Sequence, residues 1–515
     1  MMSLSNMGQH WLIVYLLAVC VHLSHQRSIP SDSTYKAAVV EYPPQYFTNG
    51  IETLKVNSDA YVRIITAAAS DYADIIVMPE DGLTTFTFPE RAEMGDWTTI
   101  IPSASDNYTP CTQDTIEVSE ALKKISCAAR NNEIYVVLNI AEKEACTAEP
   151  CTNDKVFYYN SNVVFDRTGK IIARYRKTHL YEEHKFNVRA VPEVVTFDTD
   201  FGVKFGTFIC FDILFHEPAL NLTRDLQVTD IVYPTAWFSI LPFLTAVQTQ
   251  AGWSFAEDVN LLASGYNKPS YGIGGSGIYL GRHGIGTSIM PTTTHEKLLI
   301  YDVPKMMRTS HHDQSKDRED ANDKLRKKRE NDDGTTTIED KIFLLTNNFS
   351  YFKSIALEGS TTETVCQNDF CCDFKVEVAN IDPKTKYCLM VSNGRHRFSS
   401  NVDGGVRGCG VIQCATDVNS SYFSANRSKT VFSNIEIAAT FHDYKNNLIM
   451  PSTLNSDILP LNYWVLNEYT HNDDIHVNMT IQNNNINNLV TFGIFSRNFK
   501  EDIESKPLFN IIQNK

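Results

Sequence analysis

Three residues of this 515-residue chain carry the side chains that hydrolysis of an amide requires. A thiol mechanism needs a nucleophile, a base that removes and returns protons, and a cation or N–H donors where the oxyanion forms. Cys210 supplies a thiol, Glu80 a carboxylate and Lys177 an ammonium group. Each has a plainer interpretation when taken alone, because most glutamates and lysines are solvated surface charges. Their chemistry therefore depends on whether the fold brings them together.

The cysteine count separates Cys210 from the other cysteines. Of the 12 cysteines, Cys20 lies in an N-terminal segment that we interpret as a signal peptide. Ten more form two even clusters: Cys111, Cys127, Cys146 and Cys151, then Cys366, Cys371, Cys372, Cys388, Cys409 and Cys414. An oxidising compartment is expected to pair each cluster internally and to leave Cys210 unpaired. A buried, chemically silent cysteine is the alternative.

Short apolar strands alternate with helical patterns between residues 35 and 301, which is typical of an α/β sheet covered by helices. The pattern predicts strands at 36–42, 75–79, 134–139, 163–165, 170–175, 204–209, 230–234 and 260–264, and helices at 59–72, 115–130 and 244–255. Glu80 and Cys210 each follow a strand directly, and Lys177 lies just past another. Catalytic groups in open α/β sheets lie beyond the C-terminal strand ends, so these three are expected to meet in one cleft.

The N-terminal segment and the overall charge bear on location. Residues 1–26 hold an apolar run from Trp11 to Leu23, which predicts a signal peptide. No later apolar stretch reaches the about 18 residues of a membrane span, and the polar C-terminal end gives no GPI signal, so we expect a secreted protein. A net charge of −15 argues against nucleic acid and anionic membranes as partners. Glycosylation is predicted at the sequons of Asn107, Asn221, Asn348, Asn419, Asn426 and Asn478.

The composition divides the chain after its signal peptide into three parts. Residues 27–301 form the α/β domain, residues 302–340 are dominated by charges and predict a flexible linker, and residues 341–515 predict a smaller β-rich, disulfide-containing domain. The linker contains RKKR at 326–329, which resembles the sites that secretory-pathway proprotein convertases cleave. A convertase is therefore expected to cut after Arg329, and an uncut solvated spacer is the alternative.

The segments around the three residues resemble the nitrilase superfamily of carbon-nitrogen hydrolases. MPEDG at 78–82, YRKTHL at 175–180 and CFD at 210–212 resemble its base, lysine and nucleophile segments, in family order. GTFICFDILFHEP at 206–218, YPTAW at 233–237 and GSGI at 275–278 resemble the vanin and biotinidase branch. The resemblance is strong over 35–301 and looser beyond. It implies a four-layer αββα fold, here followed by the β-rich domain.

This resemblance also implies a reaction. Members of the branch hydrolyse secondary amides, with pantetheine typical of vanins and biocytin of biotinidase. Glu80 would be the base, Lys177 and the backbone N–H of Phe211 would hold the oxyanion, and Cys210 would carry a thioester. No metal or organic cofactor has a task in this chemistry. The substrate is expected to be a small amide, and a catalytically inactive secreted binding protein is the alternative of another class.

Further residues near the motifs have two interpretations each. A second glutamate often supports the lysine in this superfamily, and Glu183 matches it better than Glu182. Trp237 and Tyr233 could line the substrate pocket or pack in the core.

Histidines near the motifs raise a rival Cys–His scheme. They are His179, His184 and His216. His216 follows Cys210 by six residues on a predicted helix, where a helix-face or supporting role is favoured.

Overall fold

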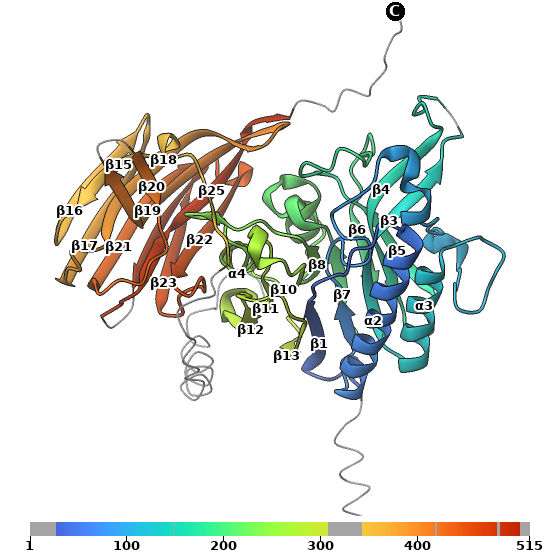
Figure 1. Cartoon of the computed structure of the whole chain (residues 1–515). Coiled ribbons are helices and arrows are strands. Elements are labelled where there is room, and N and C mark those ends of the chain that lie inside the picture. Colours follow the sequence, from blue (N-terminus) through green and yellow to red (C-terminus); the bar gives the residue numbers. More distant parts are fainter. Residues whose placement is uncertain (1–26, 148, 307–341, 418–419, 482–484, 505–515) are drawn as a thin grey trace, which may run out of the picture.

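Two six-stranded sheets form the N-terminal domain of the computed structural model, which describes residues 27–147, 149–306, 342–417, 420–481 and 485–504 (Figure 1). Three adjacent strands of each sheet are parallel, and the outer strands are antiparallel. The first sheet has the order β13 (Lys297–Pro304), β1 (Thr34–Glu41), β2 (Ile75–Val77), β3 (Tyr135–Ala145), β4 (Val156–Phe165) and β5 (Ile171–Arg176). The second has the order β12 (Ile285–Ile289), β11 (Ser276–Leu280), β10 (Asn260–Gly265), β8 (Asp230–Thr235), β7 (Lys204–Thr207) and β6 (Val195–Asp198).

Helices cover the outer faces of both sheets, so the domain has four layers (Figure 1). Helices α2 (Gly50–Ser70) and α3 (Glu120–Asn132) pack together over the first sheet, and α4 (Ala246–Glu257) lies on the second. Along β1 the side chains alternate: Ala37 and Val39 face the second sheet, whereas Ala38 and Val40 face the helices. Strands buried on both faces explain the continuous apolar runs of the sequence.

Two of the helices begin at other residues than the sequence pattern predicts. The predicted helix 59–72 begins nine residues earlier, at Gly50, because the Asn49 side chain accepts a hydrogen bond from the Glu52 N–H and caps it. The predicted helix 115–130 begins later, at Glu120, where Ser119 is the cap. Strand β13 pairs with β1 as far as Pro304, beyond the domain end predicted at residue 301.

The C-terminal domain is built from two packed antiparallel sheets. Their facing side chains form one apolar core, which includes Phe374, Val411, Ile437 and Phe492. The first sheet contains β15 (Lys353–Leu357), β18 (Lys386–Ser399), β19 (Val402–Asp417), β25 (Leu489–Glu504) and β22 (Asn447–Asn455), with β20 (Ser420–Phe423) beside β19. The second contains β16 (Thr361–Gln367), β17 (Phe370–Asn380), β21 (Val431–His442), β24 (Asp474–Ile481) and β23 (Trp464–His471). The predicted αββα fold with a β-rich second domain is confirmed.

Disulfides join cysteines within each of the two predicted clusters. The pairs are Cys111–Cys127, Cys146–Cys151, Cys366–Cys371, Cys372–Cys409 and Cys388–Cys414. Cys210 is the free cysteine of the described residues, as parity predicts. No bridge among these five connects the two domains, and the convertase motif at 326–329 lies outside the described residues.

The two domains share an apolar core, so they dock through more than surface contacts. Leu214 and Phe243 of the first domain and Met450 and Phe495 of the second belong to one buried cluster. Helix α4 packs on β22, and Gly252 lies so close to β22 that a side chain there would meet its backbone. This docking places the C-terminal domain against the segments that follow Cys210.

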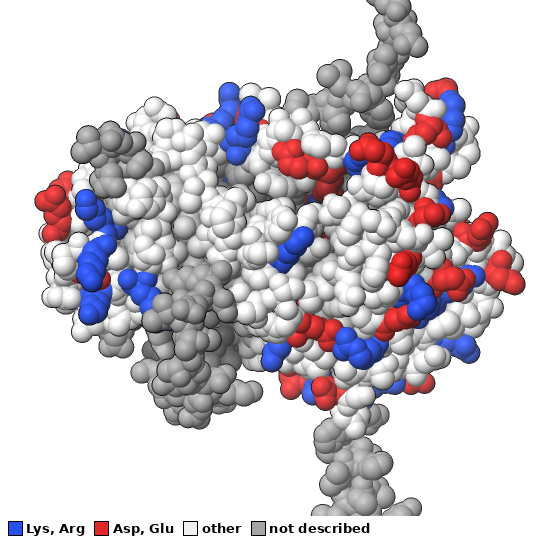
Figure 2. Space-filling view, in the orientation of Figure 1, with Lys and Arg blue, Asp and Glu red and all other residues white. Residues whose placement is uncertain are grey.

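Surface features bear on the remaining sequence predictions. Asn107, Asn348 and Asn426 are exposed, the side-chain amides of Asn221 and Asn478 donate to Asp225 and Glu436, and Asn419 lies outside the described residues. Acidic and basic side chains are interspersed over the face of the N-terminal domain in Figure 2. Within the described parts of the chain, no helix is long and apolar enough to cross a membrane.

Candidate active site

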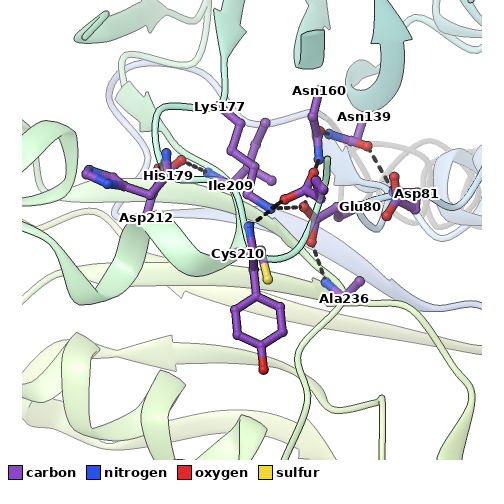
Figure 3. Close-up of polar contacts among 12 residues, drawn as sticks. Glu80, Asp81, Asn139, Asn160, Lys177, His179, Ile209, Cys210, Asp212 and Ala236 are labelled. Carbon is purple, nitrogen blue, oxygen red and sulfur yellow. Dashed lines mark hydrogen bonds and ion pairs between the residues drawn. The ribbon is translucent and has the colours of Figure 1, made fainter. Parts of the chain in front are cut away.

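Cys210 sits at a sharp turn three residues after the second-sheet strand β7. We call this turn, residues 209–214, the nucleophile turn after the role that the sequence predicts for Cys210. Cys210 has a φ of 44°, in the left-handed region that L-residues rarely adopt, and begins a short helical turn that ends at Leu214. The Tyr233 hydroxyl donates to the Cys210 carbonyl oxygen at 2.8 Å, and this hydrogen bond stabilises the backbone conformation of Cys210. The side chain is buried, with 6% exposure, beside Glu80 and Lys177 (Figure 3). The turn thus presents one thiol to two charged groups.

Glu80 follows β2 by three residues and is oriented through both of its oxygens. Its Oε1 accepts from Lys177 Nζ at 2.6 Å and from Asn160 Nδ2 at 2.9 Å. Its Oε2 accepts the backbone N–H of Ala236, which follows β8, at 2.8 Å (Figure 3). Since Oε2 has one donor here and an ionised carboxylate oxygen accepts two, it has room for the proton of a thiol or a water.

Lys177 follows β5 and lies between two carboxylates. It is 3% exposed and donates to Glu80 and to Glu183. The alternative Glu182 points elsewhere: its carboxylate accepts from the backbone and hydroxyl of Ser400 in the C-terminal domain. An ammonium has three N–H donors, so two carboxylate partners leave the third for a substrate oxygen. Of the two glutamates the sequence offered, Glu183 is the one that contacts the lysine.

The electrostatics of the site keep the Cys210 thiol protonated at rest. Burial raises the pKa of Cys210 well above its ordinary range, the charge of Glu80 raises it further, and Lys177 lowers it. Burial lowers the pKa of Lys177, but Glu183 and Glu80 outweigh this and hold it well above its ordinary value. Lys177 is therefore a permanent cation, and Cys210 is a neutral thiol at rest.

The three histidines of the rival scheme are engaged elsewhere. His179 contacts the Glu217 carbonyl at 2.7 Å and stacks on Phe215. His184 pairs with Glu182, and the ring of His216 packs on Phe499. The charges that act on Cys210 come from Glu80 and Lys177, so the arrangement favours the carboxylate scheme.

Tyr233 and Trp237, predicted either to line the pocket or to pack in the core, are both buried in the core. Tyr233 is fully buried and supports the nucleophile turn from beneath, and Trp237 Nε1 donates to the Leu244 carbonyl at 2.9 Å. Tyr181, a residue that the motifs did not single out, contacts the residue that follows Cys210. The part-buried Tyr181 ring packs edge-on against Phe211, 5.2 Å between centroids, and burial raises the pKa of its hydroxyl.

Two asparagines that sequence reasoning missed connect Glu80 to the neighbouring strands β3 and β4. Asn160 on β4 donates to both Glu80 and Glu183, and Asn139 on β3 donates to Asn160 Oδ1 at 2.7 Å. Asn139 Oδ1 also accepts the N–H of Asp81 (Figure 3). Asparagine is rare in buried strands. An asparagine within an apolar strand was therefore the sequence signal that could have identified these two residues.

Known proteins resemble this chain over both domains. Residues 36–242 match the carbon-nitrogen hydrolase family, and residues 342–502 match the vanin C-terminal domain. Vanin-like protein 1 of Drosophila melanogaster is 35% identical, over 96% of this chain and 91% of its own length. The pantetheinase of Homo sapiens is 33% identical over 82% of each chain. A crystallised amidase from Nesterenkonia sp. covers 54% of this chain and 92% of its own, with 16% identity and a TM-score of 0.40.

Fold, site and relatives agree on one class of enzyme. The protein is a carbon-nitrogen hydrolase that acts on amides other than peptide bonds. Within that class the chain belongs to the vanin-like family of the nitrilase superfamily. The inactive binding protein considered from sequence is therefore not supported.

Proposed function

We propose that the protein is a secreted pantetheinase, which hydrolyses pantetheine to pantothenate and cysteamine. The observation that carries the proposal is the buried set of Cys210, Glu80 and Lys177, in a chain 33% identical to human pantetheinase. Pantetheine contains a linear secondary amide next to its thiol-bearing end, which suits a thiol nucleophile beside a permanent cation. The signal peptide predicted at residues 1–26 and the five disulfides support secretion.

The first half of the reaction forms a thioester. Cys210 Sγ attacks the amide carbonyl carbon while its proton passes to Glu80, and the carbonyl electrons move to oxygen. Lys177 and the N–H of Phe211 stabilise that oxyanion. As the intermediate collapses, the C–N bond breaks and Glu80 gives its proton to the departing amine. The third N–H of Lys177 supports this role, because the other two face carboxylates.

The second half releases the acid. Glu80 removes a proton from water, the hydroxide oxygen attacks the thioester carbon, and the C–S bond breaks. Glu80 then returns the proton to the Cys210 sulfur, which restores the resting thiol that burial favours. Glu183 and Asn160 keep Lys177 and Glu80 aligned through both halves. We place Tyr181 next to the substrate, since its ring borders Phe211.

A direct assay tests the substrate. Purified protein is incubated with pantetheine and, separately, with biocytin, and pantothenate and biotin are quantified. Release of pantothenate with kcat/KM at least about 100-fold above that for biocytin supports the proposal, a preference of about 2.7 kcal/mol. Release of biotin at the higher rate would establish the biotinidase alternative. Turnover of neither would overturn both assignments while leaving the amidase class intact.

A further inference from the structure

Asp212 lies two residues after the nucleophile and accepts hydrogen bonds from both catalytic segments. Its Oδ2 accepts the Ile209 N–H at 3.0 Å and the Tyr175 hydroxyl at 2.7 Å. Its Oδ1 accepts the His179 N–H at 2.8 Å (Figure 3). The side chain is fully buried, and none of the catalytic roles above uses it. A buried carboxylate with three donors therefore needs its own explanation.

The three donors bracket the reacting groups. Ile209 immediately precedes Cys210, whereas Tyr175 and His179 stand two residues before and two residues after Lys177. We propose that Asp212 is a positioning residue that fixes the ammonium of Lys177 relative to the sulfur of Cys210. This inference rests on the proposed catalytic roles and deepens them: one carboxylate sets the alignment of oxyanion partner and nucleophile.

The backbone conformation of the nucleophile turn explains why the position of Cys210 needs support from Asp212. A non-glycine residue with positive φ costs on the order of 1–3 kcal/mol and persists only where its surroundings fix it. Cys210 is such a residue, and Asp212 closes the turn around it, because the Asp212 N–H donates to the Ile209 carbonyl while its carboxylate accepts the Ile209 N–H. A misplacement of about 1 Å costs roughly 100-fold in rate.

Asparagine cannot reproduce these contacts. Each carboxylate oxygen faces a backbone N–H, so the amide nitrogen of Asp212→Asn would meet a donor with a donor. Tyr175→Phe is a gentler change, because it leaves both backbone contacts of Asp212 in place and removes only the hydroxyl, which also accepts the Thr178 N–H at 3.1 Å. Asp212→Asn thus disturbs the contacts with both catalytic segments, whereas Tyr175→Phe disturbs only the contact with the Lys177 segment.

The chain supplies a matched control for both changes. Asp230 is also fully buried and accepts a tyrosine hydroxyl, that of Tyr35, at 2.7 Å, together with Asn260 and Thr229. It begins β8, at the end of the strand opposite to Ala236 and the active site. Tyr35→Phe removes a hydroxyl that donates to a buried aspartate, as Tyr175→Phe does, and Asp230→Asn neutralises a buried aspartate, as Asp212→Asn does. Asp230→Asn is the milder of the two neutralisations, because the Thr229 hydroxyl can accept from the new amide. Neither control touches a catalytic segment.

The experiment compares the four variants as full-length secreted protein. For pantetheine, kcat is expected to fall about 100-fold or more in Asp212→Asn and about tenfold in Tyr175→Phe, with KM within about threefold of wild type. The two control variants keep kcat within about threefold of wild type although their melting temperatures fall. Should Asp212→Asn not fold, the pair Tyr175→Phe and Tyr35→Phe decides.

A second readout does not depend on turnover. Lys177 lowers the pKa of Cys210, so loss of alignment should shift the pH profile of Cys210 alkylation by iodoacetamide to higher pH. The shift is expected in Asp212→Asn and Tyr175→Phe and not in the controls. Wild type that alkylates normally but leaves pantetheine intact would count against the substrate alone. Unchanged kcat and an unchanged alkylation profile in both Asp212→Asn and Tyr175→Phe, or equal losses in the controls, overturn the proposal.

Discussion

Replacing Lys177 with methionine removes the cation that separates the buried carboxylate of Glu80 from the partly buried carboxylate of Glu183. Lys177 Nζ lies 2.6 Å from Glu80 Oε1 and contacts Glu183, and the side chains of Lys177 and Glu80 are both 2% exposed. Breaking a buried ion pair from one side costs about 3–5 kcal/mol, because the remaining charge is uncompensated. At about 2–4 °C per kcal/mol, the melting temperature of the N-terminal domain should fall by roughly 6–20 °C.

The activity of the same variant should fall for a separate reason. Loss of one oxyanion partner lowers kcat by roughly 100- to 1000-fold, while KM changes much less because the charge develops in the transition state. A pure KM effect would instead indicate a role in substrate binding. Arginine is not expected to rescue kcat, since its planar fork places donors differently from a compact ammonium.

A double variant separates stability from chemistry. Adding Glu183→Gln to Lys177→Met removes the second carboxylate, so a large part of the lost melting temperature should return while kcat stays low. Lys143→Met controls for the substitution itself: that partly exposed lysine donates to the Gly95 carbonyl at 3.0 Å and forms no ion pair among the described residues, so its replacement leaves no carboxylate uncompensated. The reasoning is refuted if Lys177→Met melts like wild type, or if the double variant melts below the single one.

Three further predictions concern other groups. Cys210→Ala should abolish hydrolysis and remove the one alkylatable thiol while secretion stays normal, and residual turnover near wild type would exclude it as nucleophile. Burial raises the pKa of Glu41 from 4.5 to about 8, so the folded state holds a proton that the unfolded state releases, and stability should decline as pH rises from about 4.5 to 8. Melting curves of Glu41→Gln should lack this part of the decline, and an identical pH dependence would contradict it. Cleavage after Arg329 should give two bands on non-reducing denaturing gels that Arg329→Ala merges into one, and a single wild-type band would show an uncut spacer.

The residues to which we assign the chemistry could be predicted because each directly follows, or nearly follows, a strand within a recognisable segment. Glu80 and Lys177 follow β2 and β5 of the first sheet, Cys210 follows β7 of the second, and the packing of the two sheets brings these strand ends together. The disulfide clusters could be predicted for a similar reason, since parity and spacing are properties of the chain alone. In both cases the signal is local.

The orientation of the supporting side chains could not be predicted. Along β8, Val232 faces the core between the sheets and Tyr233 the core beneath the nucleophile turn. Both faces are apolar, so alternation alone does not tell which one reaches a pocket. Asp212, beyond β7 of the second sheet, contacts Tyr175 on β5 of the first sheet and His179 just beyond it. Asn160 on β4 contacts Glu80, which follows another strand of its own sheet. Spacing within one segment contains neither pairing.

The contacts of Arg497 could not be predicted either, because its partners include residues of the other domain. They indicate a role for the C-terminal domain near the active site. Arg497 is fully buried on β25, ion-pairs with Asp502 and donates to the carbonyl of Leu214, the last residue of the helical turn that Cys210 begins. Its guanidinium also lies over the Phe215 ring, 5.4 Å from the centroid. A buried charge persists only where its partners are fixed. The C-terminal domain is therefore part of the support of the nucleophile turn, and we predict that a protein cleaved in its linker keeps its activity only while this contact is intact.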